Sequence, residues 1–304
     1  MARLNFALRM VLARAQQGRD ACPYCESCLH HRLQRKYLLI EARQCVHCGL
    51  IFRYPTETER SAAEFYEHSY PARAEREPPS PASLAQLLGT GFAGTSRDKS
   101  GRIALMQTLR PRARVLDFGC SWGYSVYQLR NAGFTALGFE VSHRIAAFGR
   151  QHLQIEVIDR WMDLRPEVVG RFDIIYVDHV LEHLANLRAA FERFAELLYD
   201  GGLLLLFVPN CGGLLARRKG MRWRTMLGEI HTIAFTADWL VHNLPRHGFA
   251  IERIASRFDQ PESLLDGEEI TCIARANHAG NVRATVAREP SEADYCSELS
   301  LSRE

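Results

Sequence analysis

Short apolar runs alternate with helical patterns between residues 101 and 276. Each run is rich in Val, Ile, Leu or Phe and is too short for a helix, so it predicts a buried strand. In chain order the predicted strands cover residues 114–119, 135–140, 154–158, 172–178 and 203–209. This alternation of strands and helices predicts an α/β domain with a mostly parallel sheet between two layers of helices.

One helix is marked by apolar residues three or four positions apart: Leu184, Leu187, Phe191, Phe194 and Leu198. This spacing places them on one helical face, and Gly201-Gly202 predicts where the helix ends. A further helix is expected near residues 237–247. Residues 251–255 and 269–276 are alternating apolar runs that predict an antiparallel pair closing the sheet.

The first hundred residues have a different organisation. Residues 1–20 are basic up to Asp20 and predict a short amphipathic helix, with a transit peptide as the alternative. The proline-rich segment after Pro71 predicts a linker, or a lid that orders on binding. We therefore predict four parts: a helix and cysteine module over 1–60, a short aromatic helix and the linker or lid over 61–100, the α/β domain over 101–277, and a polar tail over 278–304.

Composition and charge narrow the class of protein. The 304 residues are 47% hydrophobic and 24% charged, as in an ordinary globular protein. No apolar run is long enough to span a membrane. The formal net charge is only +3, but residues 1–60 carry ten Lys or Arg and five acids. That local excess indicates either an anionic partner or a solvated basic face.

Two Cys-x-x-Cys pairs with 19 residues between them predict a metal module. They supply four ligands for one tetrahedral zinc ion: Cys22, Cys25, Cys45 and Cys48. The alternatives for one of these ligands are Cys28, His30, His31 and His47. A closed set of four ligands leaves no position for water, so the predicted zinc is structural. The remaining scattered cysteines are typical of a reducing compartment, and we expect a cytoplasmic protein.

A glycine-containing turn follows the first predicted strand. Gly119 and Gly123 allow close approach of the backbone to a ligand, and the next helix begins with unpaired N–H groups. Glu140 ends the following strand, where an acid accepts hydrogen bonds from a ribose diol. Asp117 and the Gly-x-x-x-Gly spacing suit a ligand with an ammonium and a sulfonium group better than a pyrophosphate. The sequence thus predicts a nucleoside-bearing cofactor at this end of the sheet.

The segment VLDFGCSWGY, residues 115–124, resembles motif I of the class I S-adenosylmethionine-dependent methyltransferases. Residues 172–183, 200–203 and 208–210 resemble the later motifs, in the right order and at the right spacings. The resemblance implies a Rossmann-like sheet with an antiparallel last strand, and S-adenosylmethionine as cofactor. With the cysteine pairs it resembles the branch in which a zinc ribbon precedes the methyltransferase domain, met in sugar, polysaccharide and natural-product pathways.

The resemblance assigns roles to individual residues. Positions that match the family's cofactor contacts are Asp117, Gly119, Cys120, Gly123, Tyr124, Glu140, Val141, Asp159 and Asp178. Glu140 matches the ribose acid, Val141 lies beside the adenine, and Asp159 or Asp163 meets the adenine amino group. The family often has glycine at position 121, where this chain has Ser121. The next residue, Trp122, packs either over the cofactor or against the helix behind it.

Three histidines are candidates for a catalytic base: His179, His183 and His231. Glu182 is a fourth candidate, and the alternative is that these residues fix a loop by hydrogen bonds. His179 and His183 share a helical spacing, but the sequence shows no third ligand for a metal. The basic stretch over 217–224 indicates an anionic acceptor near the site, or a solvated loop.

The function that follows is methyl transfer to a small-molecule or glycan acceptor, with a structural zinc ribbon. One alternative is a zinc-knuckle RNA methyltransferase, but no basic stretch interleaved with aromatic residues is present. Another alternative is a module that binds S-adenosylmethionine without turnover. The sequence leaves the acceptor and the oligomeric state open.

Overall fold

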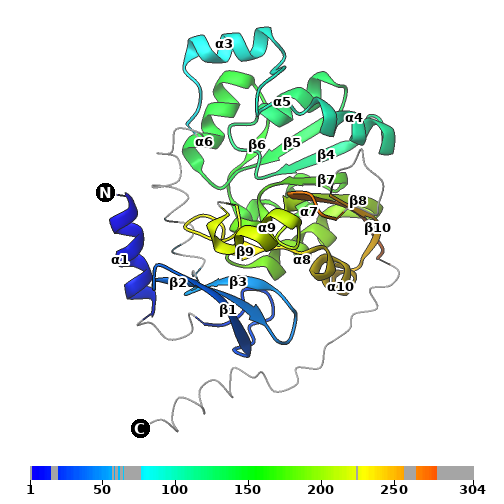
Figure 1. Cartoon of the computed structure of the whole chain (residues 1–304). Coiled ribbons are helices and arrows are strands. Elements are labelled where there is room, and N and C mark those ends of the chain that lie inside the picture. The colour runs from blue at the N-terminus through cyan, green and yellow to red at the C-terminus, as the bar shows by residue number, and fades with distance from the viewer. Residues whose placement is uncertain are drawn as a thin grey trace, which may run out of the picture.

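The computed structural model describes residues 2–14, 20–56, 58, 61, 64, 77–223, 225–256 and 265–278. A seven-stranded sheet with helices on both faces lies beside a smaller four-stranded sheet (Figure 1). The predicted helix over residues 61–70 and the predicted tail beyond His278 fall outside the described residues, apart from positions 61 and 64.

The large sheet has the strand order β10-β11-β8-β7-β4-β5-β6. Its strands are β4 (Arg114–Phe118), β5 (Thr135–Phe139), β6 (Val157–Ile158), β7 (Phe172–Asp178), β8 (Leu198–Pro209), β10 (Phe249–Ala255) and β11 (Glu269–Ala276). The pairs from β6 to β8 are parallel, whereas β11 is antiparallel to both of its neighbours. The fold class is therefore confirmed as a mostly parallel, Rossmann-like sheet with an antiparallel last strand.

The helical elements of this domain are α3 (Pro81–Gly89), α4 (Ser100–Leu109), α5 (Tyr124–Asn131), α6 (His143–Phe148), η2 (Gly149–Leu153), η3 (Trp161–Asp163), α7 (Pro166–Val169), η4 (Leu181–His183), α8 (Leu187–Leu197), α9 (Leu214–Lys219), η5 (Gly220–Arg222), α10 (Ala237–Asn243) and η6 (Leu244–His247). Successive strand residues point to opposite faces. Val115 packs in one core with Met106 of α4 and Leu129 of α5. Leu116 packs in a second core with Phe194 of α8 and Leu240 of α10.

Three predictions of secondary structure were wrong. The strand expected over residues 154–158 is reduced to the two residues of β6. The helix marked by apolar spacing ends at Leu197, not at the glycine pair, because Leu198 already pairs with Phe172 in the sheet. The segment after Pro71 is not a plain linker in its second half, since α3 occupies residues 81–89. Its Pro81 stands in the first helical turn, where proline is tolerated, and Ser80 caps the helix. The lid alternative stays a prediction.

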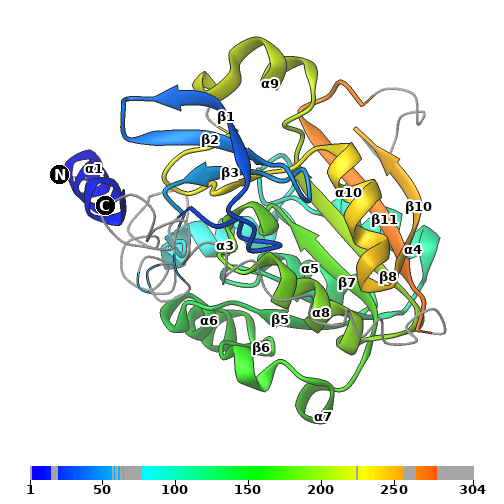
Figure 2. The same cartoon turned by 90° about the horizontal axis from the view of Figure 1, so that it is seen from below.

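The small sheet has the order β1-β2-β3-β9. Strands β1 (His30–Lys36), β2 (Ile40–Cys45) and β3 (Ile51–Tyr54) belong to the cysteine module. Strand β9 (Ile233–Ala234) comes from the segment after β8, and it pairs with β3 through Ile51 and Phe52. Helix α1 (Ala2–Arg14) lies against this sheet (Figure 2). The cysteine module is thus built into the large domain, which the sequence did not indicate.

The described residues contain no helix that is both long and apolar enough to cross a membrane.

Candidate functional site

The glycine turn joins β4 to α5 in a backbone conformation that requires glycine. Gly119 and Gly123 have φ angles of +85° and +83°. A Cβ atom on Gly119 would collide with Val180, and one on Gly123 with Ile155. Ser121 has a φ of 52°, also left-handed, which explains why glycine often stands at this position in the family it resembles.

Glu140 ties this turn to the end of β5. Its two carboxylate oxygens accept hydrogen bonds from the backbone N–H groups of Ser121 at 3.1 Å and Ser142 at 2.9 Å. The side chain is half-buried, and the neighbouring Val141 is exposed. A carboxylate held at this edge, beside an apolar residue, fits a ribose and an adenine. Asp159 follows β6 and binds Arg150 at 2.8 Å, whereas Asp163 lies in η3.

Asp117 lies at the end of β4 just before this turn, and Trp122 is a residue of the turn itself. The buried Asp117 accepts a hydrogen bond from Ser125, and burial raises its pKa to about 7. Trp122 is 1% exposed and its ring lies near Phe92 and Phe148. The ring of Trp122 thus packs against Phe148 of α6, and its position relative to a cofactor stays a prediction.

Asp178, at the end of β7, is held by cations that the sequence analysis missed. Lys99 contacts its carboxylate at 2.7 Å, and the Tyr176 hydroxyl donates to it at 2.6 Å. Burial alone would raise the pKa of Asp178, but Lys99 and Arg102 hold it at about 2. Lys99 and Arg102 lie at the start of α4, far from Asp178 along the chain, and no local pattern marks them.

His179 is clamped between two carboxylates. Its Nδ1 lies 3.2 Å from Glu182 and its Nε2 lies 2.9 Å from Glu269. Burial lowers the pKa of His179, but the hydrogen bonds to these carboxylates prevail and raise it to about 10. At neutral pH both ring nitrogens therefore carry protons and donate them. This geometry disfavours His179 as a general base and favours a cationic role that positions its neighbours.

His183 and His231 meet over the buried Glu182. Their ring centroids are 4.8 Å apart, and ligand atoms of all three residues lie within 4.8 Å of one another. The Nδ1 of His231 lies 2.6 Å from the Thr225 carbonyl, and the Nδ1 of His183 lies 3.3 Å from the Ile230 carbonyl. Each Nδ1 can then donate to its carbonyl, which leaves Nε2 as the accepting nitrogen of the neutral ring. The Nε2 of His183 lies 3.9 Å from Glu182 Oε1. Two histidines and a carboxylate also form a set able to hold a metal ion.

This cluster adjoins the glycine turn, because Val180, which fills the space beside Gly119, directly precedes η4. Sequence reasoning named all three histidines but did not place His231 against His183. No local pattern relates them, since His231 comes from the segment between β8 and α10.

Arg53 of β3 holds the segment that carries His231. Its guanidinium is buried and donates to the carbonyls of Gly228 at 2.6 Å and Glu229 at 3.1 Å. Its backbone N–H donates to Thr232 at 2.8 Å, and the Thr232 N–H donates to the Glu182 carbonyl at 2.9 Å. A continuous set of hydrogen bonds therefore runs from the cysteine module to the histidine cluster.

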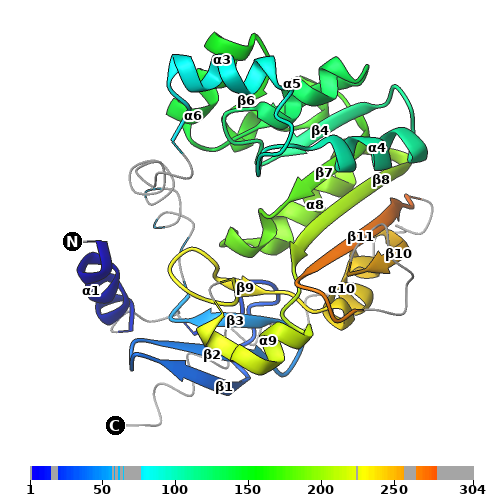
Figure 3. The same cartoon turned by 45° about the horizontal axis from the view of Figure 1, so that its top comes forward.

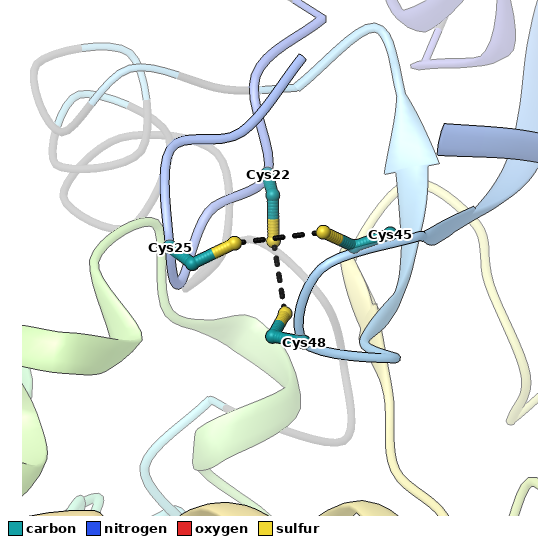
Figure 4. Close-up of side chains that lie close together, drawn as sticks. All are labelled: Cys22, Cys25, Cys45 and Cys48. Atoms are coloured by element: carbon teal, nitrogen blue, oxygen red, sulfur yellow. Dashed lines mark hydrogen bonds between the residues drawn. The ribbon is translucent and has the colours of Figure 1, made fainter. Parts of the chain in front are cut away.

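The four predicted zinc ligands converge from two turns (Figure 4). The Sγ atoms of Cys22 and Cys48 are 3.6 Å apart, and those of Cys25 and Cys45 are 3.5 Å apart. A tetrahedral ion with Zn–S bonds of about 2.3 Å needs sulfur atoms about 3.8 Å apart. The four thiols are thus compatible with one zinc ion. Within the described residues, none of the alternative ligands joins this group.

Both cysteine turns dock on the large domain. Arg188 of α8 donates to the Tyr24 carbonyl at 3.1 Å, and Asn243 of α10 donates to the Cys48 carbonyl at 3.2 Å. The cysteines belong to the same apolar core as α8 and α10. The two cysteine turns are therefore packed directly on α8 and α10.

The basic stretch after β8 lies against the cysteine module. The Met221 N–H donates to Gln34 at 2.8 Å, and Lys36 donates to the Met221 carbonyl at 2.8 Å. Arg217 instead pairs with Asp266. Arg224 lies outside the described residues. The stretch therefore forms one continuous surface with β1.

Comparison with known proteins agrees with this geometry. Residues 95–254 match the family described as "Methyltransferase domain". The chain is 28% identical over 130 residues to phosphoethanolamine N-methyltransferase 3 of Arabidopsis thaliana, covering 40% of this chain and 26% of that protein. It is 29% identical over 117 residues to a ubiquinone biosynthesis O-methyltransferase of Xanthomonas campestris, covering 36% of this chain and 47% of that protein. The chain thus spans about a quarter to a half of these relatives.

A solved structure shares the fold. The magnesium protoporphyrin IX methyltransferase of Synechocystis with bound S-adenosylhomocysteine aligns with a TM-score of 0.50 and 16% sequence identity. The alignment covers 72% of this chain and 100% of the Synechocystis chain.

Proposed function

The chain belongs to the class I S-adenosylmethionine-dependent methyltransferases, and from this premise we propose that it methylates a small-molecule or glycan acceptor with His231 as the general base. The observation that carries the proposal is the position of His231, which lies against His183 and Glu182, next to the segment that packs on the glycine turn. The two relatives described above are named for methylation of phosphoethanolamine and for ubiquinone biosynthesis, which supports the small-molecule class of acceptor.

The chain's own residues would hold the cofactor at the ends of β4 and β5. Bound S-adenosylmethionine supplies a methyl group activated by a sulfonium. Glu140 is fixed by two backbone N–H groups and would receive the ribose hydroxyls, with Val141 beside the adenine. Gly119 and Gly123 keep the turn close to Val180 and Ile155, which fixes its shape. Asp117 supports the turn from below through Ser125.

His231 is better suited than His179 to accept a proton from the acceptor. The Thr225 carbonyl can accept a hydrogen bond from Nδ1 of His231, and this tautomer of the neutral ring leaves the lone pair on Nε2. His179 is already protonated between Glu182 and Glu269. His183 is 6% exposed, and its contact with the ring of His231 would hold that ring in its orientation. In this arrangement, the acceptor atom loses its proton to His231 Nε2 as it takes the methyl group.

We propose that zinc at the four cysteines has a structural role. It would hold the two cysteine turns, and through β3 and Arg53 it would fix the segment that carries His231. The ribbon would therefore form one wall of the acceptor side. From the scattered cysteines we also propose a cytoplasmic location.

Two measurements test the function. Calorimetric titration of the zinc-loaded protein with S-adenosylmethionine and S-adenosylhomocysteine should show binding, and NAD should show none. In an acceptor screen, His231→Ala should lower kcat/KM by roughly 10²–10⁴-fold while cofactor affinity is unchanged. The matched control is His242→Ala on α10, whose Nδ1 also meets a backbone carbonyl. Equal activity of His231→Ala and the control would exclude His231 as the base.

A further inference from the structure

Two basic segments that are far apart in the sequence form one surface. Strand β1, with the sequence HHRLQRK, and the segment from α9 through η5, with the sequence LLARRKGMR, contain no acidic residue. They are joined by hydrogen bonds of Gln34 and Lys36 to Met221. Figure 2 and Figure 3 both show α9 beside β1. The cations of this surface are Arg32, Arg35, Lys36, Arg218, Lys219 and Arg222; all are exposed except the half-buried Lys36.

Large apolar side chains are exposed on the same module. The turn between β1 and β2 presents Tyr37 at 79% exposure and Leu38 at 73%, and Leu33 of β1 is exposed as well. Eight of the fifteen large apolar side chains that the described part of the chain exposes lie between Leu8 and Val46. Charged residues on an edge strand protect against aggregation, whereas exposed Tyr and Leu side chains at the adjoining turn favour association with another apolar surface.

The backbone of this turn is also unusual. Tyr37 and Leu38 both have left-handed φ angles, of 53° and 56°. They are the central residues of a turn in which the Leu39 N–H donates to the Lys36 carbonyl at 3.2 Å, and Asn and Gly adopt this conformation at lower cost. Two bulky apolar residues are held here, at the exposed tip of a hairpin, against the local preference. A conformational cost at an exposed position points to a contact with something outside the chain.

Helix α1 extends the apolar part of the surface. Arg14 donates to the Leu39 carbonyl at 3.1 Å, which places the end of α1 next to the hairpin turn. Met10 packs into the core of the module, whereas Leu8, Val11 and Leu12 are exposed.

We propose that the surface formed by the β1–β2 hairpin and the α9–η5 segment, here called the basic hairpin face, binds an anionic lipid surface. Apolar side chains at a protruding tip, flanked by Lys and Arg, match the two contributions to interfacial binding: burial of the tip among acyl chains and attraction of the cations to anionic headgroups. A nucleic acid would instead call for stacking aromatic residues, and Tyr37 is the one ring at this tip. The proposal does not depend on which acceptor is methylated.

Flotation with vesicles tests the proposal on the full, zinc-loaded chain. The protein should float with vesicles of phosphatidylcholine that contain phosphatidylglycerol, and should stay behind with pure phosphatidylcholine. Binding should weaken as salt is added. Tyr37→Ser/Leu38→Ser should abolish most of the flotation. Arg218→Gln/Arg222→Gln should weaken partitioning by roughly five-fold for each cation removed.

Matched controls lie on the large domain. Val168→Ser removes an exposed apolar side chain from α7, and Arg112→Gln removes an exposed cation. Both should float like the unmodified chain. Loss of flotation in these controls, or no flotation of the unmodified chain, would overturn the proposal. A third result would also overturn the proposal: the unmodified chain does not bind vesicles but forms a dimer in light scattering, or binds a poly(U) strand, and Tyr37→Ser/Leu38→Ser abolishes that association.

Discussion

Arg53 of the cysteine module donates a hydrogen bond of 2.6 Å to the Gly228 carbonyl, three residues before His231. The guanidinium is completely buried, so the contact is made without competition from water. Arg53 therefore connects the cysteine module to the segment that carries His231.

We expect Arg53→Met to lower kcat while the Kd for S-adenosylmethionine stays the same. The carbonyls of Gly228 and Glu229 lose their donor, at a cost of about 1–3 kcal/mol each in stability, and the segment with His231 loses its fixed position. Steady-state kinetics and calorimetry measure the two quantities. Arg43→Met is the control, because Arg43 binds Glu41 within the module and does not contact this segment. A similar fall in kcat for the control would mean that any damage to the module has this effect.

Removal of one zinc ligand should affect metal content, stability and activity together. Cys45→Ser is expected to lose most of its zinc and to unfold at a lower temperature, because binding energy at a closed site is folding energy. Metal analysis and thermal unfolding are the measurements. Cys272→Ser removes a buried thiol outside the group and should keep its zinc. Full zinc content in Cys45→Ser would point to Cys28 or a histidine as the fourth ligand.

Glu140→Ala should weaken cofactor binding by roughly 1–3 kcal/mol, through loss of the hydrogen bonds to the ribose and of those that hold Ser121 and Ser142. Calorimetric titration with S-adenosylhomocysteine gives the difference directly. Glu156→Ala, on the exposed side of the segment before β6, serves as the control. An unchanged Kd for Glu140→Ala would remove Glu140 from the cofactor site.

The ion pairs of His179 predict that the stability of the fold depends on pH. Its pKa is raised from 6.5 to about 10 in the folded chain, so its ion pairs add stability that is complete below the unfolded value. That contribution is lost as the pH rises toward about 10. His179→Gln should therefore destabilise the protein more at pH 6 than at pH 10. Urea unfolding of both proteins at the two pH values measures this. An equal effect at both would show that His179 is not charged in the fold.

Much of the large domain was predictable because its signals are local. The strand β7 and the helix α8 are continuous patterns, and the turn with Gly119 and Gly123 has left-handed φ angles that favour glycine. The position of Glu140 relative to the turn follows from the βαβ connection. The fold class, the antiparallel last strand and the glycine turn could thus be inferred from spacing and resemblance.

The rest depends on contacts between distant segments. Lys99 and Arg102 reach Asp178 only after the sheet has formed, and His231 reaches His183 only after β9 has paired with β3. Strand β9 is two residues long, which is too short for any periodic pattern. The end of α8 was misplaced because pairing of Leu198 with Phe172 outweighs its helical spacing. Local propensity does not encode such long-range pairings.

The pairing of β3 with β9 has a consequence for synthesis of the chain. When the cysteine turns leave the ribosome, the outer edge of β3 has no partner, because the two residues that will cover it have not been made. An unpaired strand edge invites association with other chains. Early capture of zinc would hold the cysteine turns in a compact form while the large domain is translated, and the edge closes only when residues 233–234 arrive. Scarcity of metal during translation would then reduce the yield of folded enzyme as well as its activity.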